Sequence, residues 1–118
     1  MSWELKKDRP IYTQLLEQIE QKIISGEYGK GSKMPSVREL ASEAAVNPNT
    51  MQRAMAELEN RGLIITNRTW GRVVTEDEEI LTQIRESRAK DFTKDYMSKM
   101  SELKYSKEEI IEFIRKGE

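Results

Sequence analysis

The chain has 118 residues, of which 35% are charged and 36% apolar, and its formal net charge is −1. Because it contains neither cysteine nor histidine, disulfides, thiolate catalysis and cysteine-based zinc sites are excluded, and the usual general base of enzymes is missing. No apolar run approaches the roughly 20 residues of a membrane helix, and no signal peptide is recognisable. We therefore expect a cytoplasmic protein without metal or cofactor.

The charges are unevenly distributed along the chain. Residues 1–75 carry 11 Lys and Arg against 9 Asp and Glu, whereas residues 76–118 carry 9 against 12. A local basic excess favours nucleic-acid binding, but an excess this small supports it only weakly. The lean apolar fraction also favours burial against a second subunit.

A first helix is predicted from about residue 10 to residue 25. Pro10 suits the first turn of a helix, where its missing N–H costs nothing, and Gly26 is typical of the position that follows a helix. Between them lies one apolar face with amphipathic spacing. It consists of Ile11, Tyr12, Leu15, Leu16, Ile19 and Ile23.

Residues 35–55 predict two further helices joined by a tight turn. Ser36 and Glu39 have the spacing of a capping box, which begins one helix. Asn47 followed by Pro48 is typical of the cap and first position of the next helix, and Gly62 would end that helix near residue 61. This is the arrangement of a helix-turn-helix, whose second helix enters the DNA major groove.

A β-hairpin is predicted directly after this pair of helices. Residues 63–66 and 72–75 are short β-rich runs, separated by residues 67–71. A hairpin in this place is the wing of a winged helix-turn-helix. The expected fold class is therefore mainly α with a small β-hairpin wing, and residues 1–75 would form the DNA-binding domain.

Residues 76–118 are predicted to form a C-terminal helical arm. A first helix carries one long apolar stripe that polar residues interrupt around Arg88, and a second helix follows the capping box of Ser106 and Glu109. Both are too apolar on one side to stand alone in water, so we expect a dimerisation arm, with an effector pocket as the alternative. The residues singled out for the dimer or effector region are Ile84, Phe92, Tyr96 and Met100.

The motifs together resemble the GntR family of bacterial transcription regulators over about residues 9–75. The matching segments include Pro10-Ile11-Tyr12, Met34 to Ala41, Val46 to Thr50 and Arg61 to Ile64. Only about 43 residues follow the predicted wing, and so short a two-helix tail is similar to the YtrA subfamily. The resemblance implies a dimeric repressor, often one that controls an operon for an ABC transporter.

The sequence departs from the family at two positions. Ala45 stands in the turn where the family usually has glycine, and alanine there costs about 1–2 kcal/mol if the residue is left-handed. The wing has Thr69-Trp70-Gly71-Arg72 in place of the usual Gly-x-Gly. Contact between the wing and DNA therefore stays open.

The resemblance places DNA contacts on the two helices, and the wing adds basic residues at its loop. Asparagine can bond adenine edges, threonine a phosphate or thymine methyl, and arginine phosphate or guanine. Simpler explanations exist, since Asn47 also caps a helix and exposed arginines are common. The candidate DNA-binding residues are Ser36, Arg38, Asn47, Asn49, Thr50, Arg53, Arg68, Trp70, Gly71 and Arg72.

These features predict a homodimeric, sequence-specific repressor that binds an inverted-repeat operator in double-stranded DNA. Control of an ABC-transporter operon and a small-molecule effector are further options. A winged-helix module for protein–protein contact is the main alternative, and duplex DNA affinity would separate the two. An enzyme is disfavoured, because histidine, cysteine and a Gly-rich phosphate loop are all missing.

Overall fold

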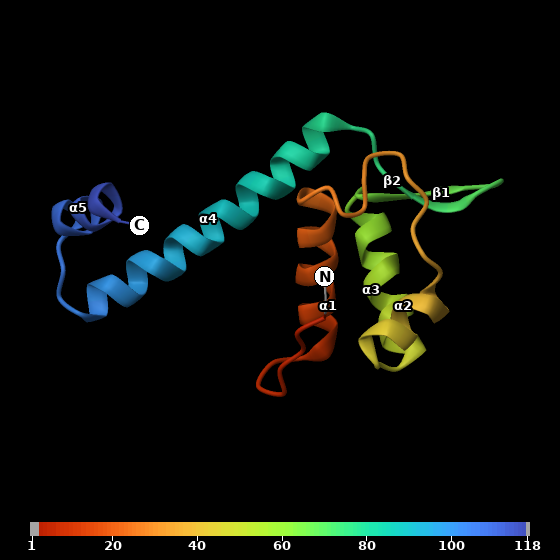
Figure 1. Ribbon diagram of the computed structural model, residues 1–118, viewed down its shortest axis with the longest axis horizontal. Helices are drawn as coiled ribbons and strands as arrows, with labels where there is room; N and C mark the ends of the chain where they lie inside the picture. Colours follow the sequence, from red (N-terminus) through yellow and green to blue (C-terminus); the bar gives the residue numbers. More distant parts are fainter. Residues whose placement is uncertain (1–2, 118) are drawn as a thin grey trace. The chain divides into compact units, whose positions relative to one another are not determined.

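The computed structural model describes residues 3–117, which divide into two compact units between Thr82 and Gln83. The first unit holds α1, α2, α3, the β1–β2 hairpin and the start of α4, and the second holds the rest of α4 and α5 (Figure 1). The expected fold class, mainly helical with one two-stranded hairpin, is confirmed. The domain boundary predicted between residues 75 and 76 stays a prediction.

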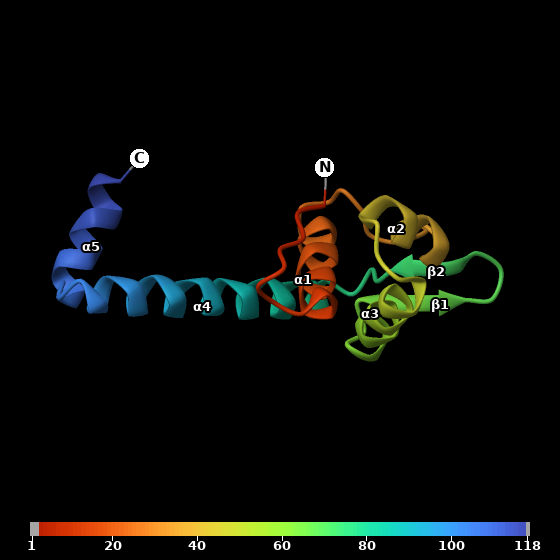
Figure 2. The same cartoon turned by 90° about the horizontal axis from the view of Figure 1, so that it is seen from below.

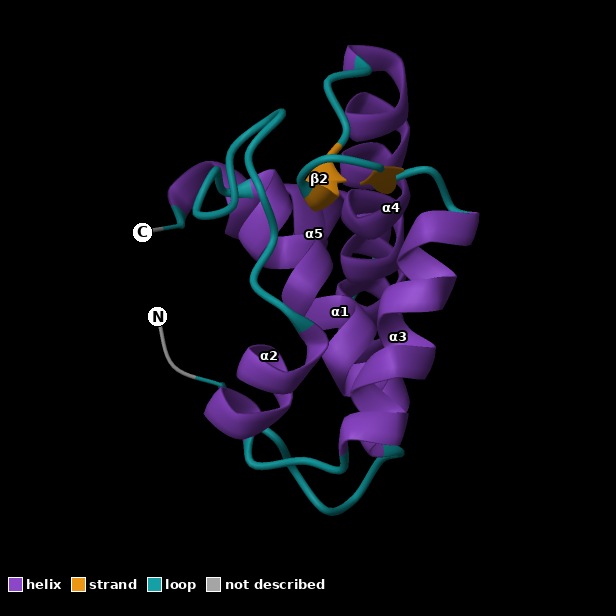
Figure 3. Ribbon diagram, turned by 90° about the vertical axis from the view of Figure 1, so that its right-hand side faces the viewer, coloured by secondary structure: helices purple, strands orange, loops and turns teal. Residues whose placement is uncertain are grey.

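The first unit is built on three helices, α1 (Ile11–Ile24), α2 (Val37–Ala44) and α3 (Pro48–Asn60). Both α1 and α2 pack on α3, and Figure 3 shows the three together. Pro10 was predicted inside the first helix, but it is the N-cap, with ψ 135°. Its extended backbone keeps it outside the helix, although its carbonyl accepts the first helical bond from Gln14 N at 3.3 Å.

The core of the first unit lies where α1, α2, α3 and the base of the hairpin meet. The apolar side chains Met51, Ala54, Met55 and Leu58 of α3 are buried, as is most of the face predicted for α1. The side chains with no exposed surface are Leu15, Ile19, Leu40, Met51, Ala54, Met55, Leu58 and Leu63. Burial of this many large apolar side chains, each worth about 1.5–3 kcal/mol, fixes α3 against the two other helices.

The segment before α1 is fastened to that helix by two glutamines. The buried Gln14 accepts from Lys6 N at 2.6 Å and donates to the carbonyls of Lys6 and Arg9 at 2.7 and 2.9 Å. Gln18 accepts from Glu4 N at 3.0 Å and donates to Glu4 O at 2.7 Å. These paired amide bonds hold the backbone of residues 4–9 along α1.

The predicted hairpin forms as β1 (Ile64–Asn67) and β2 (Gly71–Val74), paired antiparallel with Ile64 opposite Val74. Residues 31–34 run along the other edge of β2, where Met34 N donates to Arg72 O at 2.8 Å. The pairing of residues 31–34 with β2 was not predicted from the sequence. Figure 2 shows the hairpin tip projecting beyond the helices of the first unit.

The C-terminal helices are α4 (Glu78–Glu102) and α5 (Lys107–Lys116). Asp77 begins α4 by accepting from Glu79 N at 2.9 Å, and the helix continues through Arg88, where the apolar pattern is interrupted. The predicted capping box of α5 is confirmed, since Ser106 Oγ accepts from Glu109 N at 3.2 Å. Within residues 3–117, no helix combines the length and hydropathy that a membrane crossing requires.

Candidate nucleic-acid interface

The start of α2 has the predicted capping box. Ser36 Oγ accepts from Glu39 N at 3.1 Å, and Glu39 Oε1 accepts from Ser36 N at 3.2 Å. Arg38 follows on the exposed side of the first turn. The cap therefore orients a helix start at which Ser36 and Arg38 both face solvent.

The turn between α2 and α3 contains a left-handed alanine. Ala45 has φ 57° and ψ 48°, which is the conformation anticipated from the glycine usual in the family. Val46 N reaches back to Ala41 O at 3.0 Å and closes the end of α2. The alanine side chain costs about 1–2 kcal/mol in this conformation, and the turn delivers the chain directly to the start of α3.

The first turn of α3 presents polar side chains over a buried base. Asn47 Oδ1 accepts from Asn49 N at 2.7 Å, and Pro48 occupies the first helical position, as predicted. Asn47 and Asn49 are exposed and Thr50 is half-buried. This turn, fully described, carries no acidic residue, so its free N–H groups and partial positive charge favour an anion such as phosphate.

Arg53 lies one turn further along α3 and is stacked on α1. Its guanidinium carbon is 4.6 Å from the centroid of the Tyr12 ring, while the residue stays exposed. Such cation–π contacts are worth about 0.5–1 kcal/mol at exposed sites. Tyr12 therefore limits where the Arg53 guanidinium can go without neutralising its charge.

Two residues of this surface were missed at the sequence level. Gln52 is exposed and lies three positions after Asn49, so both share a face of α3, and its amide can bond a base edge. The helical spacing could have identified it. Tyr12 was assigned to an apolar face, and its contact with Arg53 depends on packing between helices that the sequence does not display.

The two basic residues predicted for the wing, Arg68 and Arg72, lie in different surroundings. Arg68 and Trp70 are exposed in the loop, with 59% of Trp70 accessible, and Gly71 ends the loop with φ 84°. Asn67 Oδ1 shapes the tip by accepting from Thr69 N at 2.8 Å and Trp70 N at 3.1 Å. Arg68 and Trp70 are thus presented to solvent at the tip of a hairpin.

Arg72, in contrast, is engaged inside the unit. Its Nε donates to the Glu59 carboxylate on α3, which also accepts from Thr66 Oγ1 at 2.9 Å. The hydrogen bond from Arg72 is the main reason that the pKa of Glu59 is lowered, and the bond from Thr66 acts in the same direction. The network attaches the wing to α3 and leaves Arg72 less available to DNA than Arg68.

The residues predicted for a dimer or effector region all lie in the second unit. Phe92 and Tyr96 are exposed, and Ile84 and Met100 are half-buried. A cavity of about 460 Å³ in this unit is lined by other residues, including Tyr105, Glu112 and Phe113. Among residues 3–117, no three acidic side chains are grouped as metal ligands would be.

The comparisons with known proteins agree with this geometry. The family "Bacterial regulatory proteins, gntR family" matches residues 11–74. The HTH-type transcriptional regulator YhcF of Bacillus subtilis is 35% identical over 98% of this chain and 95% of its own length. The HTH-type transcriptional repressor YtrA of the same organism is 40% identical over 61% of this chain and 55% of its own length.

Solved structures show the same fold. A GntR family transcriptional regulator from Listeria monocytogenes has a TM-score of 0.87 and 42% identity, over 97% of this chain and 100% of that one. The DNA-binding domain of AraR, solved in complex with operator ORX1, has a TM-score of 0.53 and 26% identity, over 64% of this chain and 92% of that one. The chain therefore belongs to the GntR family of bacterial transcriptional regulators, with a winged-helix DNA-binding fold, and is not an enzyme.

Proposed function

We propose that the chain is a homodimeric transcriptional repressor that reads an inverted-repeat operator with the first turn of α3. The observation that carries this proposal is the exposed amide pair Asn47 and Asn49 on a turn whose opposite face is completely buried. A recognition helix that enters the major groove needs one face packed firmly on the protein and another face with accessible polar side chains. The AraR complex supports duplex DNA as the partner of this fold.

The contacts divide by chemistry between bases and phosphates. Asn49, Thr50 and the additional Gln52 would bond base edges, while Arg38 and Arg53 would hold phosphate or guanine. Ser36 and Asn47, both at helix N-caps, would position the backbone N–H groups toward phosphate. In the wing, Arg68 and Trp70 would rest on the sugar-phosphate backbone beside Gly71, with Arg72 holding the wing in place.

The dimer is supported by apolar surface on the second unit. Its exposed large side chains are Phe92, Tyr96, Leu103, Tyr105, Ile111, Phe113 and Ile114. Exposed apolar side chains in this number favour an interaction surface, and a second copy of the chain is the simplest partner. A two-fold dimer would present two recognition helices and so require half-sites about one helical turn or more apart.

The relatives support repression as the mode of regulation. YtrA of B. subtilis is named a repressor, which supports repression here, and resemblance to its subfamily suggests an ABC-transporter operon as the target. This role would place the protein in the cytoplasm. Deleting the gene should raise transcripts of a neighbouring transporter operon, and unchanged or lowered transcripts would contradict repression.

The decisive experiment separates base reading from general affinity. An operator selected from random duplexes would be titrated with the wild type and with the double variant Asn49→Ala and Thr50→Ala. Each good base contact is worth about 1–3 kcal/mol of discrimination, so the loss of two contacts should lower the ratio of specific to non-specific affinity about 30-fold or more. The helical circular dichroism should remain.

A matched control variant replaces one asparagine and one threonine outside the proposed DNA surface. Asn60→Ala with Thr82→Ala changes exposed positions at the end of α3 and in α4 and should leave the ratio within about twofold. An unchanged ratio in the α3 variant would refute the assignment. Duplex affinity that does not fall with added salt would instead favour the protein–protein module.

A further inference from the structure

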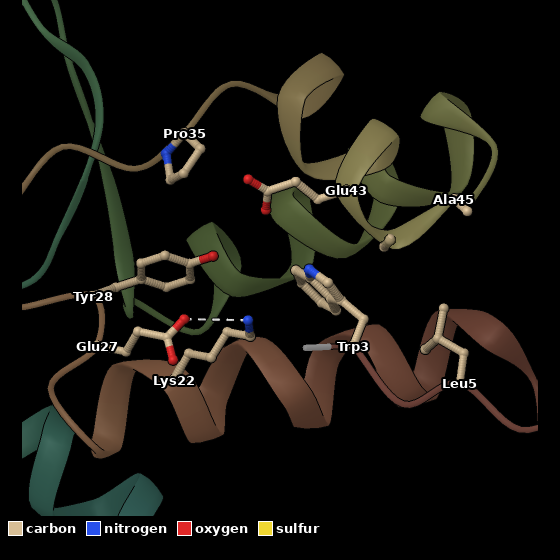
Figure 4. A pocket seen from close by; sticks show the side chains of 9 residues that line it. Trp3, Leu5, Lys22, Glu27, Tyr28, Pro35, Glu43 and Ala45 are labelled. Atoms are coloured by element: carbon tan, nitrogen blue, oxygen red, sulfur yellow. Dashed lines mark hydrogen bonds and ion pairs between the residues drawn. The ribbon is translucent and has the colours of Figure 1, made fainter. Parts of the chain in front are cut away.

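A cavity of about 770 Å³ lies within the first unit. Its walls come from the segment before α1, the last turns of α1 with the loop behind it, and the end of α2. Figure 4 shows the side chains of Trp3, Tyr28 and Glu43 converging on this space. None of these residues has a role in the proposed DNA contacts.

The cavity already holds one ammonium group by aromatic and carboxylate contacts. Lys22 Nζ lies 4.4 Å from the centroid of the Trp3 ring and 5.8 Å from that of Tyr28. It also pairs with Glu27 at 3.2 Å, and only 4% of its side chain is exposed. Aromatic faces combined with a carboxylate are the usual recognition elements for organic ammonium ions.

A second carboxylate in the wall lacks such a partner. Glu43 is exposed on α2 and makes no ion pair within the described part of the chain. Since Lys22 is neutralised by Glu27, the described residues that line the cavity leave one net negative charge, on Glu43. Burial raises the pKa of Tyr28 to about 12, with Glu43 and Glu27 adding to the effect, so its hydroxyl stays protonated at neutral pH.

We propose that this cavity binds an organic ammonium ion, with the cation beside the Glu43 carboxylate and in contact with the Trp3 indole. The Tyr28 hydroxyl, which points into the same space (Figure 4), supplies a hydrogen bond to a polar group on the ligand. An anionic ligand would face two carboxylates, and a purely apolar one would desolvate Glu43 without compensation. Both are therefore disfavoured.

The cavity lies next to the turn that sets the recognition helix. Ala44 and Ala45 form part of its wall, and Ala45 is the left-handed residue two positions before the cap of α3. The affinity of a ligand that contacts both α1 and this turn would depend on the position of α3. Ligand binding and DNA binding would then be coupled. This effector role rests on the proposed function, whereas ligand binding itself does not.

Binding can be measured on the protein alone by tryptophan fluorescence. The chain has two tryptophans, so a Trp70→Phe background leaves Trp3 as the reporter in the cavity. Choline chloride should change its emission saturably. The uncharged carbon isostere 3,3-dimethyl-1-butanol should bind about tenfold or more weakly, and sodium chloride at equal ionic strength should give no saturable change.

Two variants locate the charge effect. Glu43→Gln should weaken choline binding about tenfold by removing the carboxylate, whereas Glu86→Gln, an exposed carboxylate on α4, should leave it within about twofold. Equal binding of choline and its isostere, no saturable change, or an unaffected Glu43→Gln variant would each overturn the site. Both substitutions are on exposed positions, and circular dichroism would verify folding.

The effector role has its own readout. Saturating choline should change the operator dissociation constant of the wild type by about threefold or more, a small but typical coupling, and Glu43→Gln should abolish the change. Choline binding without any change in operator affinity would overturn the effector role. Failure of the wild type to bind operator without choline would count against the proposed function instead.

Discussion

The two units of the chain use their apolar residues in opposite ways. In the first unit all the large apolar side chains of α3 and most of those of α1 are buried, and several have no exposed surface. In the second unit Ile110 is 2% exposed, but Phe92, Ile114 and Leu103 are 62%, 63% and 66% exposed. The first unit thus buries most of its own apolar side chains. The second unit needs a partner surface to bury its apolar side chains, because residues 83–117 do not cover them.

The difference also corrects the single apolar stripe predicted for the long helix. At about 100° per residue, Ile80, Leu81 and Ile84 centre on a direction roughly 110° away from that of Phe92 to Leu103. None of the described residues of α4 is buried, but the first group is half-buried and includes Ile80, which approaches Gly62. Residues spaced four apart move about 40° around a straight helix at each step. The apolar residues of α4 therefore form two patches, one near its start and one from Phe92 onward.

The largest expected effect comes from charging the exposed patch of the second unit. Phe92→Glu places a carboxylate within the proposed dimer surface, where a buried unpaired charge costs several kcal/mol. The dimer dissociation constant should rise at least about 100-fold, as measured by sedimentation. Operator affinity should fall with it, while the circular dichroism of the first unit is unchanged.

Ser98→Glu provides the matched control for this change. It adds the same charge to α4 at an exposed position roughly 155° around the helix from the patch centre, so the dimer constant should stay within about threefold. A Phe92→Glu protein that remains dimeric would show that the apolar surface of the second unit has another use. The contrast between the two units would then have to be explained differently.

A smaller effect is expected from the turn that ends α3 in the first unit. Gly62 has φ 82°, and a Cβ there would lie 3.1 Å from Ile80 Cδ1. Gly62→Ala should therefore lower the free energy of unfolding by about 1–2 kcal/mol, measured by urea denaturation. Dimerisation through the second unit should be unaffected.

Gly29→Ala is the control at a glycine without these constraints. A Cβ at Gly29 meets nothing within 4 Å, so alanine there should be neutral or stabilise slightly by restricting the unfolded chain. The reverse change, Ala45→Gly, should relieve the left-handed alanine of the turn. Equal losses at Gly62 and Gly29 would refute the role of backbone conformation at the end of α3.

The local features of the first unit could be predicted from sequence, because short-range chemistry determines them. The capping box of Ser36 and Glu39 and the Asn47-Pro48 start of α3 both form as expected. Each depends on residues within four positions of one another, where spacing alone fixes which groups meet. This is why the candidate recognition turn was found.

The features that the sequence did not reveal depend on contacts between distant segments. Arg72 was assigned to DNA contact, yet it pairs with Glu59, 13 positions earlier. Arg53 stacks on Tyr12 of another helix, and residues 31–34 pair with β2. Residue type shows that an arginine is charged, but only packing decides whether that charge is offered to DNA or used inside the protein.

The smallest expected effect concerns the Glu59–Arg72 pair, which acts within the first unit alone. Its carboxylate has a pKa below the usual value of 4.5, so its contribution to stability is complete above that pH and is lost as the pH falls through the lowered pKa. Glu59→Gln should therefore cost about 0.5–1 kcal/mol at pH 7, and progressively less toward pH 3, in urea denaturation. In an Arg72→Gln background the same substitution should cost little at either pH, because the partner is already removed. A cost that stays constant with pH would show that packing of the Glu59 side chain, rather than its charge, holds the wing on α3.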